Sequence, residues 1–185
     1  MESFIMTSFH EYAQNWIQRV GSDNKKYYGA EWGYKNGDIE FPLRQHMSIE
    51  THQSILGFHT NKGRLCFGEE NCYFLILEEF SEQDLLSCIK LIDDLAEQDV
   101  DFRDPRHQYT FENLVVVTQQ LPEKEVVKKI KKYRLMKRYR QAKEEYGWHS
   151  GSICLVSLSD EQFVHSAYGD TLENRLARTA FDFGK

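Results

Sequence analysis

Apolar residues in the early part of the chain follow the spacing of one helix and then of several strands. They recur at three- and four-residue intervals over residues 8–20, which predicts an amphipathic helix. Asn36-Gly37 favours the positive φ angles of a tight hairpin turn and has a strand-like segment on each side. Pro42 is expected to restrict the second of these strands to an edge or to its end. The predicted strands cover residues 30–34, 38–43, 46–53, 54–60, 64–67 and 73–77.

Helical and strand patterns alternate in the later part of the chain. Ser81 and Asp84 form a capping motif before an apolar stripe, which predicts a helix to about residue 98. Apolar residues recur every three positions from Val127 to Tyr139, and Gly147 follows, so this segment is predicted to be one long helix. The remaining predictions are a loop over residues 99–110, strands over 113–118, 152–158 and 163–167, and a last helix over 171–179.

This order of elements predicts an α+β fold. Strands with short connections dominate the first half and helices interrupt the second. That order is typical of a largely antiparallel sheet with helices packed on one face, here with one long basic helix. Residues 1–185 are expected to fold as a single α+β domain that buries roughly 70% of the surface of the unfolded chain. A hydrophobic content of 41% suits such a folded protein.

Charge is distributed unevenly along the chain. The formal net charge is −6, yet residues 124–143 contain ten of the 23 basic residues and one acidic residue, Glu125. That window therefore has a net charge of +9, and the rest of the chain has −15. A cationic element in an acidic protein indicates a polyanion, an acidic protein surface or a second copy of the chain as partner. A solvated helix surface is the alternative interpretation.

The basic segment is the leading candidate for a binding site. The leading hypothesis is therefore that the chain is a non-enzymatic binding protein. RNA or another single-stranded nucleic acid is the expected ligand, because basic side chains neutralise phosphates and aromatic rings stack on exposed bases. Trp148 follows the segment and is either such a stacking residue or a core anchor. The candidate binding residues are Lys128, Lys129, Lys131, Lys132, Tyr133, Arg134, Lys137, Arg138, Arg140 and Trp148.

A second hypothesis, from a different class, concerns a group of histidines and carboxylates. Strand alternation places His46, Glu50 and His52 on one face, and a carboxylate between two imidazoles can bind a divalent metal or transfer protons. Asp38 and Glu40 share a face of the preceding strand and would complete the ligands of a metal-dependent hydrolase or nuclease. The spacing matches no known metal signature, and a half-buried sheet with a polar face contains the same residues.

Other signals narrow the classes of protein. Cys66, Cys72, Cys88 and Cys154 form no Cys-x-x-Cys pair, and the sequence contains no secretion signal and no apolar run of about 20 residues. We therefore expect reduced thiols and a cytoplasmic protein without a membrane partner. No glycine-rich phosphate loop is present, so no cofactor is expected. A self-associating accessory protein is a third hypothesis, in which a homo-oligomer forms without a ligand.

Several features between His107 and Leu172 occur in a characteristic order. A strand ends in Val115-Val116-Val117-Thr118, a basic segment begins at residues 125–133, and Gly147-Trp148 precedes a second apolar strand. In this order they resemble a family of uncharacterised bacterial and archaeal proteins. The family has no established activity. The resemblance implies a shared fold unit in which the basic segment and Gly147-Trp148 belong to the scaffold.

Overall fold

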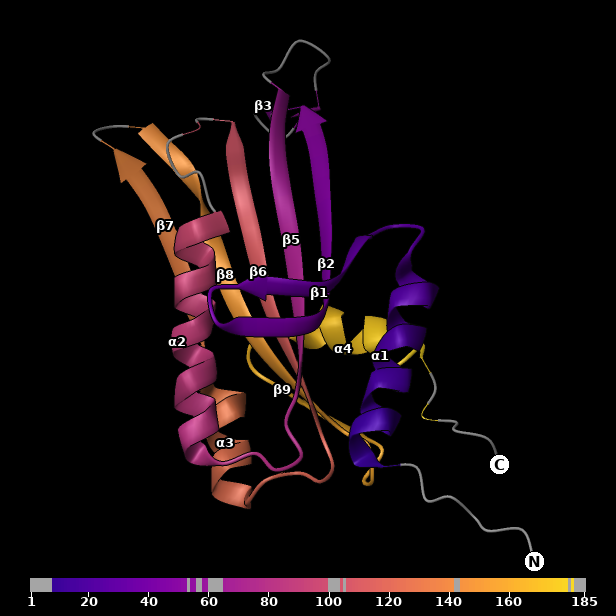
Figure 1. Cartoon of the computed structure of the whole chain (residues 1–185). Coiled ribbons are helices and arrows are strands. Elements are labelled where there is room, and N and C mark those ends of the chain that lie inside the picture. The colour runs from indigo at the N-terminus through magenta and orange to yellow at the C-terminus, as the bar shows by residue number, and fades with distance from the viewer. Residues whose placement is uncertain are drawn as a thin grey trace, which may run out of the picture.

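The chain forms one large sheet with four helices, as a computed structural model shows for residues 8–52, 54–55, 58–59, 65–99, 104, 106–141, 144–179 and 181 (Figure 1). The described residues contain a seven-stranded sheet of order β1-β2-β5-β6-β8-β7, and β9 pairs with β8. Its strands are β1 (Gly29–Asn36), β2 (Ile39–His52), β5 (Leu65–Ile76), β6 (His107–Thr118), β7 (Leu135–Gln141), β8 (Glu144–Ser157) and β9 (Gln162–His165). The short strands β3 (Ser54–Ile55) and β4 (Phe58–His59) pair separately. The helices are α1 (Phe9–Asn24), α2 (Glu82–Asp99), α3 (Lys124–Lys132) and α4 (Asp170–Leu176).

The predicted α+β class and the largely antiparallel sheet are confirmed. β1 with β2, β2 with β5, β7 with β8 and β8 with β9 are antiparallel pairs. The central pairs, β5 with β6 and β6 with β8, are parallel. Parallel neighbours require a crossover connection, which α2 supplies between β5 and β6, and α3 with β7 supplies between β6 and β8.

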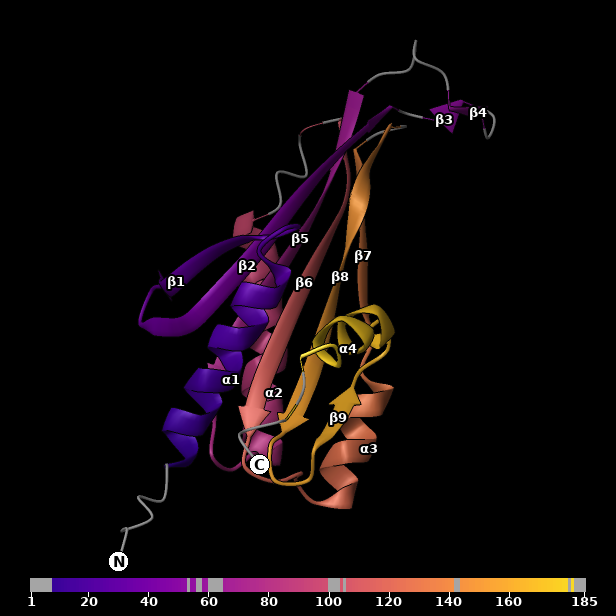
Figure 2. The same ribbon diagram turned by 90° about the vertical axis from the view of Figure 1, so that its right-hand side faces the viewer.

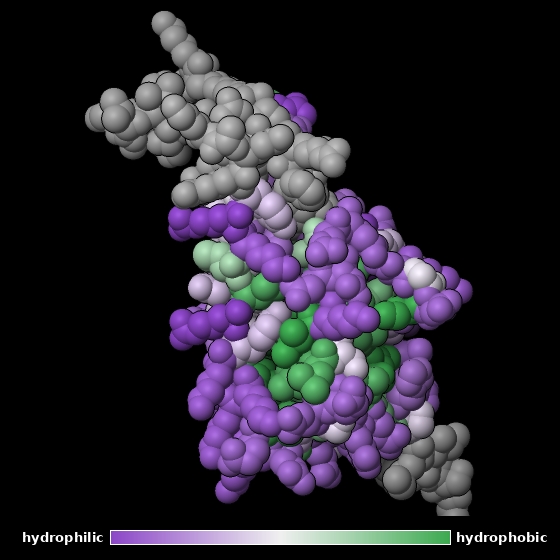
Figure 3. Space-filling view, turned by 90° about the vertical axis from the view of Figure 1, so that its left-hand side faces the viewer, coloured by the Kyte–Doolittle hydropathy of each residue, from purple (hydrophilic) through white to green (hydrophobic). Residues whose placement is uncertain are grey.

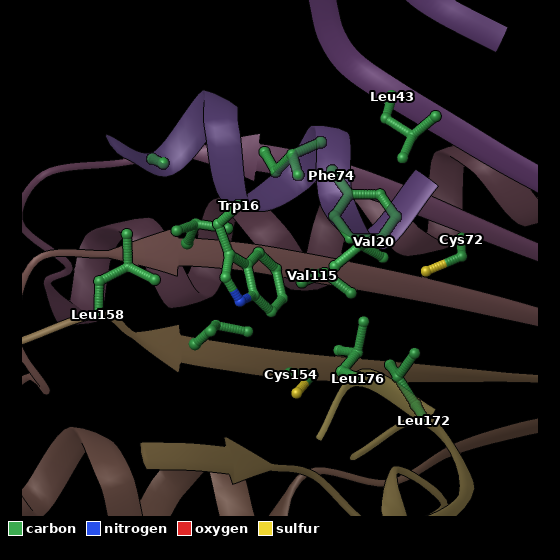
Figure 4. Close-up of a cluster of buried hydrophobic side chains, with 14 residues drawn as sticks. Trp16, Val20, Leu43, Cys72, Phe74, Val115, Cys154, Leu158, Leu172 and Leu176 are labelled. Atoms are coloured by element: carbon green, nitrogen blue, oxygen red, sulfur yellow. The ribbon is translucent and has the colours of Figure 1, made fainter. Parts of the chain in front are cut away.

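The helices cover both faces of the sheet, so the prediction of helices on one face is wrong. α1 and α4 pack on one face, where Trp16, Phe74, Val115 and Cys154 belong to one core cluster (Figure 4). α2 and α3 pack on the other face, which Figure 1 shows to the left of the central strands. Continuous apolar runs such as Leu114–Val117 follow from burial on both sides of a strand. We refer to the two sides as the α1/α4 face and the α2/α3 face.

The long basic helix predicted beyond Val127 is also wrong. α3 ends at Lys132, Tyr133 has an extended backbone, and the chain continues as β7. An α-helix has 3.6 residues per turn, so apolar residues spaced by three drift about 60° around the axis at each step and leave any single face. Within β7 the half-buried residues Leu135 and Tyr139 both occupy odd positions, which fits the period of a strand.

The strands predicted over residues 38–43 and 46–53 are one strand, β2. Pro42 lies just beyond Leu43, where the pairing of β2 with β5 ends, so the missing N–H removes no hydrogen bond from that ladder. On the other side the pairing with β1 steps over Gly33, whose φ of +62° marks an irregularity opposite the proline. The predicted turn after residue 60 lies outside the described residues, and β6 begins inside the predicted loop, at His107.

The local signals at the first hairpin and at the start of α2 are confirmed, whereas α1 continues past the predicted end at residue 20 to Asn24. β1 and β2 form the predicted hairpin, with Gly37 at φ +58°. At the start of α2, the Asp84 N–H donates to Ser81 Oγ at 3.3 Å and the Ser81 N–H donates to Asp84 Oδ2 at 2.8 Å. None of the helices in the described part of the chain has both the length and the apolar character that a membrane crossing requires.

The core around Trp16 gives the first testable prediction. Trp16 is fully buried, and its indole N–H has no hydrogen-bond partner among the described residues. Trp16→Ala leaves a large cavity but removes that unsatisfied group, so we expect a loss of about 3 kcal/mol in the free energy of unfolding, measured by urea denaturation. Trp32 is 52% exposed, and the control Trp32→Ala should cost about 1 kcal/mol. Equal losses in the two variants would contradict the assignment of the core.

Candidate functional site

The basic residues predicted as one helix face are divided between α3 and the edge strand β7. Three of them form ion pairs with carboxylates on their own side of the molecule. Lys128 Nζ lies 2.7 Å from Glu125 Oε1. Two further pairs join the segment to α2, Lys129 to Glu82 at 2.6 Å and Lys137 to Asp93 at 3.1 Å. These three cations therefore act partly as scaffold.

Apart from Lys124 at the start of α3, the remaining cations of this segment with described side chains lie at the end of α3, at its junction with β7 or on β7. Lys131 and Arg134 line a pocket of about 380 Å³ between α3, β9 and α4, together with His165 and Ser166. Figure 3 shows that this side of the molecule is mostly hydrophilic around a smaller apolar area. We define the basic edge as four exposed cations: Lys131 and Lys132 at the end of α3, Arg134 at the junction, and Arg138 on β7.

Tyr133 and Arg140 also belong to the predicted binding set but are not part of the basic edge. The half-buried Tyr133 ring packs against the core of the α2/α3 face, and its hydroxyl is buried. Burial raises the pKa of Tyr133. Arg140 belongs to β7, but its side chain lies outside the described residues.

Trp148 belongs to a group of three aromatic rings on the α1/α4 face, formed with Tyr109 and Phe111 of β6. Tyr109 and Trp148 are register partners, with ring centroids 5.6 Å apart and planes 28° apart. Phe111 meets the edge of Trp148 at 5.3 Å. All three rings are half-buried. We call them the aromatic platform, which combines the stacking and anchoring roles expected of Trp148.

Backbone geometry places this platform beside the basic edge. Arg138 of β7 is the register partner of Trp148, so both side chains leave the same face of neighbouring strands. On the other side Gly68 of β5 is the partner of Tyr109, and a Cβ at Gly68 would lie 2.2 Å from the Tyr109 ring. The Tyr109 ring therefore lies directly on the backbone of β5.

A small polar pocket adjoins the platform. It has a volume of about 100 Å³ and is lined by Glu70, Phe111, Asn113, Tyr168, Thr171 and Leu172. Glu70 Oε2 accepts a 2.8 Å hydrogen bond from Tyr28, and Glu70 Oε1 accepts from Asn113 Nδ2 at 3.4 Å. Asn113 Oδ1 accepts in turn from Ser152 at 2.5 Å. These bonds fix the direction of the carboxylate, and we call this the Glu70 pocket.

A buried guanidinium lies next to the Glu70 carboxylate. Arg175 of α4 is 9% exposed, lies 3.8 Å from Glu70 Oε1 and stacks on the Tyr28 ring at 4.2 Å. Burial raises the pKa of Tyr28, so its hydroxyl stays a donor to Glu70. Burial also raises the pKa of the Cys72 thiol to about 12, which leaves it protonated and a poor nucleophile.

Hydrogen-bonded polar side chains also lie on the α2/α3 face. Glu112 is fully buried and accepts from Asn71 Nδ2 at 3.0 Å. Asn71 accepts from Arg44 at 3.1 Å, and Arg44 also forms a 3.2 Å ion pair with Glu31. The Tyr34 ring lies 4.8 Å below the guanidinium. This network crosses from β1 through β2 and β5 to β6 and holds a buried carboxylate by hydrogen bonds and a nearby cation.

His149 of β8 extends the polar residues of that face. It is fully buried, and its Nδ1 shares a hydrogen bond with the Tyr139 hydroxyl of β7. Burial, and to a smaller extent the charge of Lys137, lowers the pKa of His149 to about 4. The imidazole is therefore neutral at pH 7.

The second sequence hypothesis placed Asp38 and Glu40 on a strand beside the histidines. His46 and Glu50 do share a face of β2, and His46 packs over Gly29. Asp38 and Glu40 precede them in the same hairpin and strand, so Asp38 lies about 25 Å from His46 along the chain direction. The side chain of His52 lies outside the described residues. Within the described ranges, no group of three or more metal-ligating side chains is close enough to hold a metal.

Sequence reasoning missed the platform partners Tyr109 and Phe111 and the pocket residues Glu70 and Arg175. Tyr109, Phe111 and Asn113 alternate in sequence, so the strand predicted from residue 113 could have been extended back into the predicted loop that contains Tyr109. The parallel pairing of β5, β6 and β8 brings their side chains together, and no local pattern specifies that pairing.

Comparison with known protein families identifies a family for most of the chain. A family described as Domain of unknown function (DUF8052) matches residues 13–178. Comparisons with curated proteins and with solved structures gave no match for the chain.

The buried imidazole predicts a pH dependence of stability. Because the pKa of His149 falls from about 6.5 in the unfolded chain to about 4 in the fold, its contribution is complete above pH 6.5 and is lost as the pH falls toward 4. We expect this group to lower the free energy of unfolding by about 2 kcal/mol at pH 4.5 relative to pH 7. Urea denaturation at both pH values checks this, and His149→Gln should reduce the difference. If the difference in the free energy of unfolding between the two pH values is the same in His149→Gln as in the parent, other titrating groups cause it.

Proposed function

Because the chain belongs to the DUF8052 family, its activity has to be inferred from its own site, and we propose that it binds single-stranded nucleic acid, RNA first. The observation that carries this proposal is the aromatic platform beside the basic edge. Tyr109, Phe111 and Trp148 offer stacking surface on adjacent strands, and Arg138 lies next to Trp148. In this proposal the protein acts as a binding module.

The chemistry of the platform favours single strands over duplex. Stacking requires bases whose faces are free, and those faces are covered in a duplex. A base stacked on one aromatic side chain contributes about 1–3 kcal/mol, with little dependence on sequence. Half-buried rings on a sheet are held in place before the ligand arrives, so little conformational entropy is lost on binding.

The basic edge supplies the contacts to phosphate. Lys131 and Arg134 at the base of β7 and Arg138 further along the strand follow one edge of the sheet. A single strand whose bases stack on the platform would run its backbone past these cations. The rest of the chain is acidic and repels a polyanion, so it confines the ligand to this edge.

The stacking contribution is tested with a tryptophan substitution. We expect Trp148→Ala to weaken the binding of a labelled decauridine by about 10-fold or more, because one stacked base loses its partner. Fluorescence anisotropy in 50 mM salt measures the dissociation constant. Trp32→Ala removes another exposed tryptophan, on β1, and should leave the affinity unchanged. No binding of decauridine by the parent protein would overturn the proposed function.

The phosphate contacts are tested by the salt dependence of binding and by substitutions that remove positive charge. Four contacts to a single strand give a slope of about −3 in log K against log salt. A variant in which the basic edge is changed to glutamine should lose most of that slope and bind weakly at 50 mM salt. The matched control removes four other exposed lysines, so that the net charge changes equally while the edge stays intact: Lys25, Lys26, Lys35 and Lys90. Equal weakening in both variants would indicate a general charge effect and no site.

A further inference from the structure

We propose that the Glu70 pocket is a base-recognition subsite that selects guanine within the bound strand. This inference rests on the proposed function, because the pocket shares Phe111 with the aromatic platform. A strand stacked on the platform would therefore pass the mouth of the pocket. The remaining walls come from β5, β6, the β9–α4 connection and α4, so the pocket forms only in the folded protein.

The acceptor in the pocket is held in a fixed direction. Each oxygen of the Glu70 carboxylate takes a hydrogen bond from the protein, one from Tyr28 at 2.8 Å and one from Asn113 at 3.4 Å. Arg175 lies 3.8 Å away and compensates the negative charge. A carboxylate has about four lone-pair sites, so each oxygen can accept one more donor. Glu70 therefore offers a bidentate acceptor to a ligand with two adjacent N–H groups.

Guanine is the base that fits this acceptor. Its N1–H and N2–H₂ groups point in the same direction and match the two oxygens of a carboxylate, whereas adenine and cytosine present one exocyclic amino group. The Asn113 amide carries two N–H donors, of which one reaches Glu70, and the other can donate to guanine O6. A pocket of about 100 Å³ corresponds to the share of about three water molecules, which suits the polar edge of one base.

Tyr168 gives an independent observation at the same pocket. It has φ +70°, a left-handed conformation that costs a bulky residue about 1–2 kcal/mol, and it is 46% exposed. Strained backbone of this kind concentrates at functional sites. Tyr168 adds a second aromatic ring to the lining of the pocket, besides Phe111, and a base that enters would contact both rings.

The experiment compares three labelled RNA decamers by fluorescence anisotropy: decauridine, and the same strand with one central guanosine or one central adenosine. The parent protein should bind the guanosine strand about tenfold more tightly than the other two, because a bidentate pair discriminates by about one order of magnitude. In Glu70→Gln the ratio between the guanosine and uridine strands should fall to about one. Trp148→Ala should weaken all three, and Lys35→Gln on the distant hairpin should change none.

Glu70→Gln leaves the buried Arg175 without a carboxylate partner and could therefore destabilise the fold. A second variant tests the pocket without this defect. Tyr168→Gly relieves the backbone strain and removes a ring that only a base inside the pocket would contact. It should therefore be at least as stable as the parent to heat and still reduce the guanosine preference. Equal binding of the three strands by the parent would overturn this inference and leave the platform proposal intact. A guanosine preference that persists in both variants would also overturn it. Failure of the parent to bind any strand would overturn the proposed function itself.

Discussion

Burial of β5, β6 and β8 on both faces is the constraint from which the rest of this structure follows. The three strands are parallel, so each connection must cross the sheet, and α2 and α3 cover one face as they do so. α1 and α4 cover the other face, and α4 is only seven residues long. The strands extend beyond these helices (Figure 2). That uncovered length of the α1/α4 face is where Tyr109, Phe111 and Trp148 lie half-exposed, so the platform is a result of helix lengths as much as of the aromatic residues.

Much of the local structure was predictable from sequence, and the arrangement was not. Asn36-Gly37 and the Ser81–Asp84 cap specify their own geometry through backbone angles and hydrogen bonds between near neighbours. The order of the strands depends on contacts between residues tens of positions apart, such as Asn71 with Glu112. The basic segment shows a different failure. Its period of three fitted neither helix nor strand, and tertiary pairing of β7 with β8 decided the outcome.

The candidate site was predictable only as a set of residue types. Charge identified the segment that contains Arg134 and Arg138, and Trp148 was recognised as either an anchor or a stacking ring. The partners of Trp148 come from β6, and Glu70 and Arg175 come from elements more than 100 residues apart.

The two faces of the sheet carry different kinds of polar and aromatic residues. The α2/α3 face holds a buried polar network with a neutral His149, whereas the α1/α4 face offers partly exposed rings and an ordered carboxylate.

The position of β7 at the end of the sheet has a consequence for the behaviour of the protein in concentrated solution. An edge strand presents unpaired backbone N–H and C=O groups, which can add a strand from another molecule and lead to aggregation. Arg138 of β7 and Arg134 just before the strand place like charges along this edge, so two copies that approach edge to edge repel each other. The same arginine residues that are proposed to contact a polyanion therefore also oppose the addition of a strand from another copy of the chain.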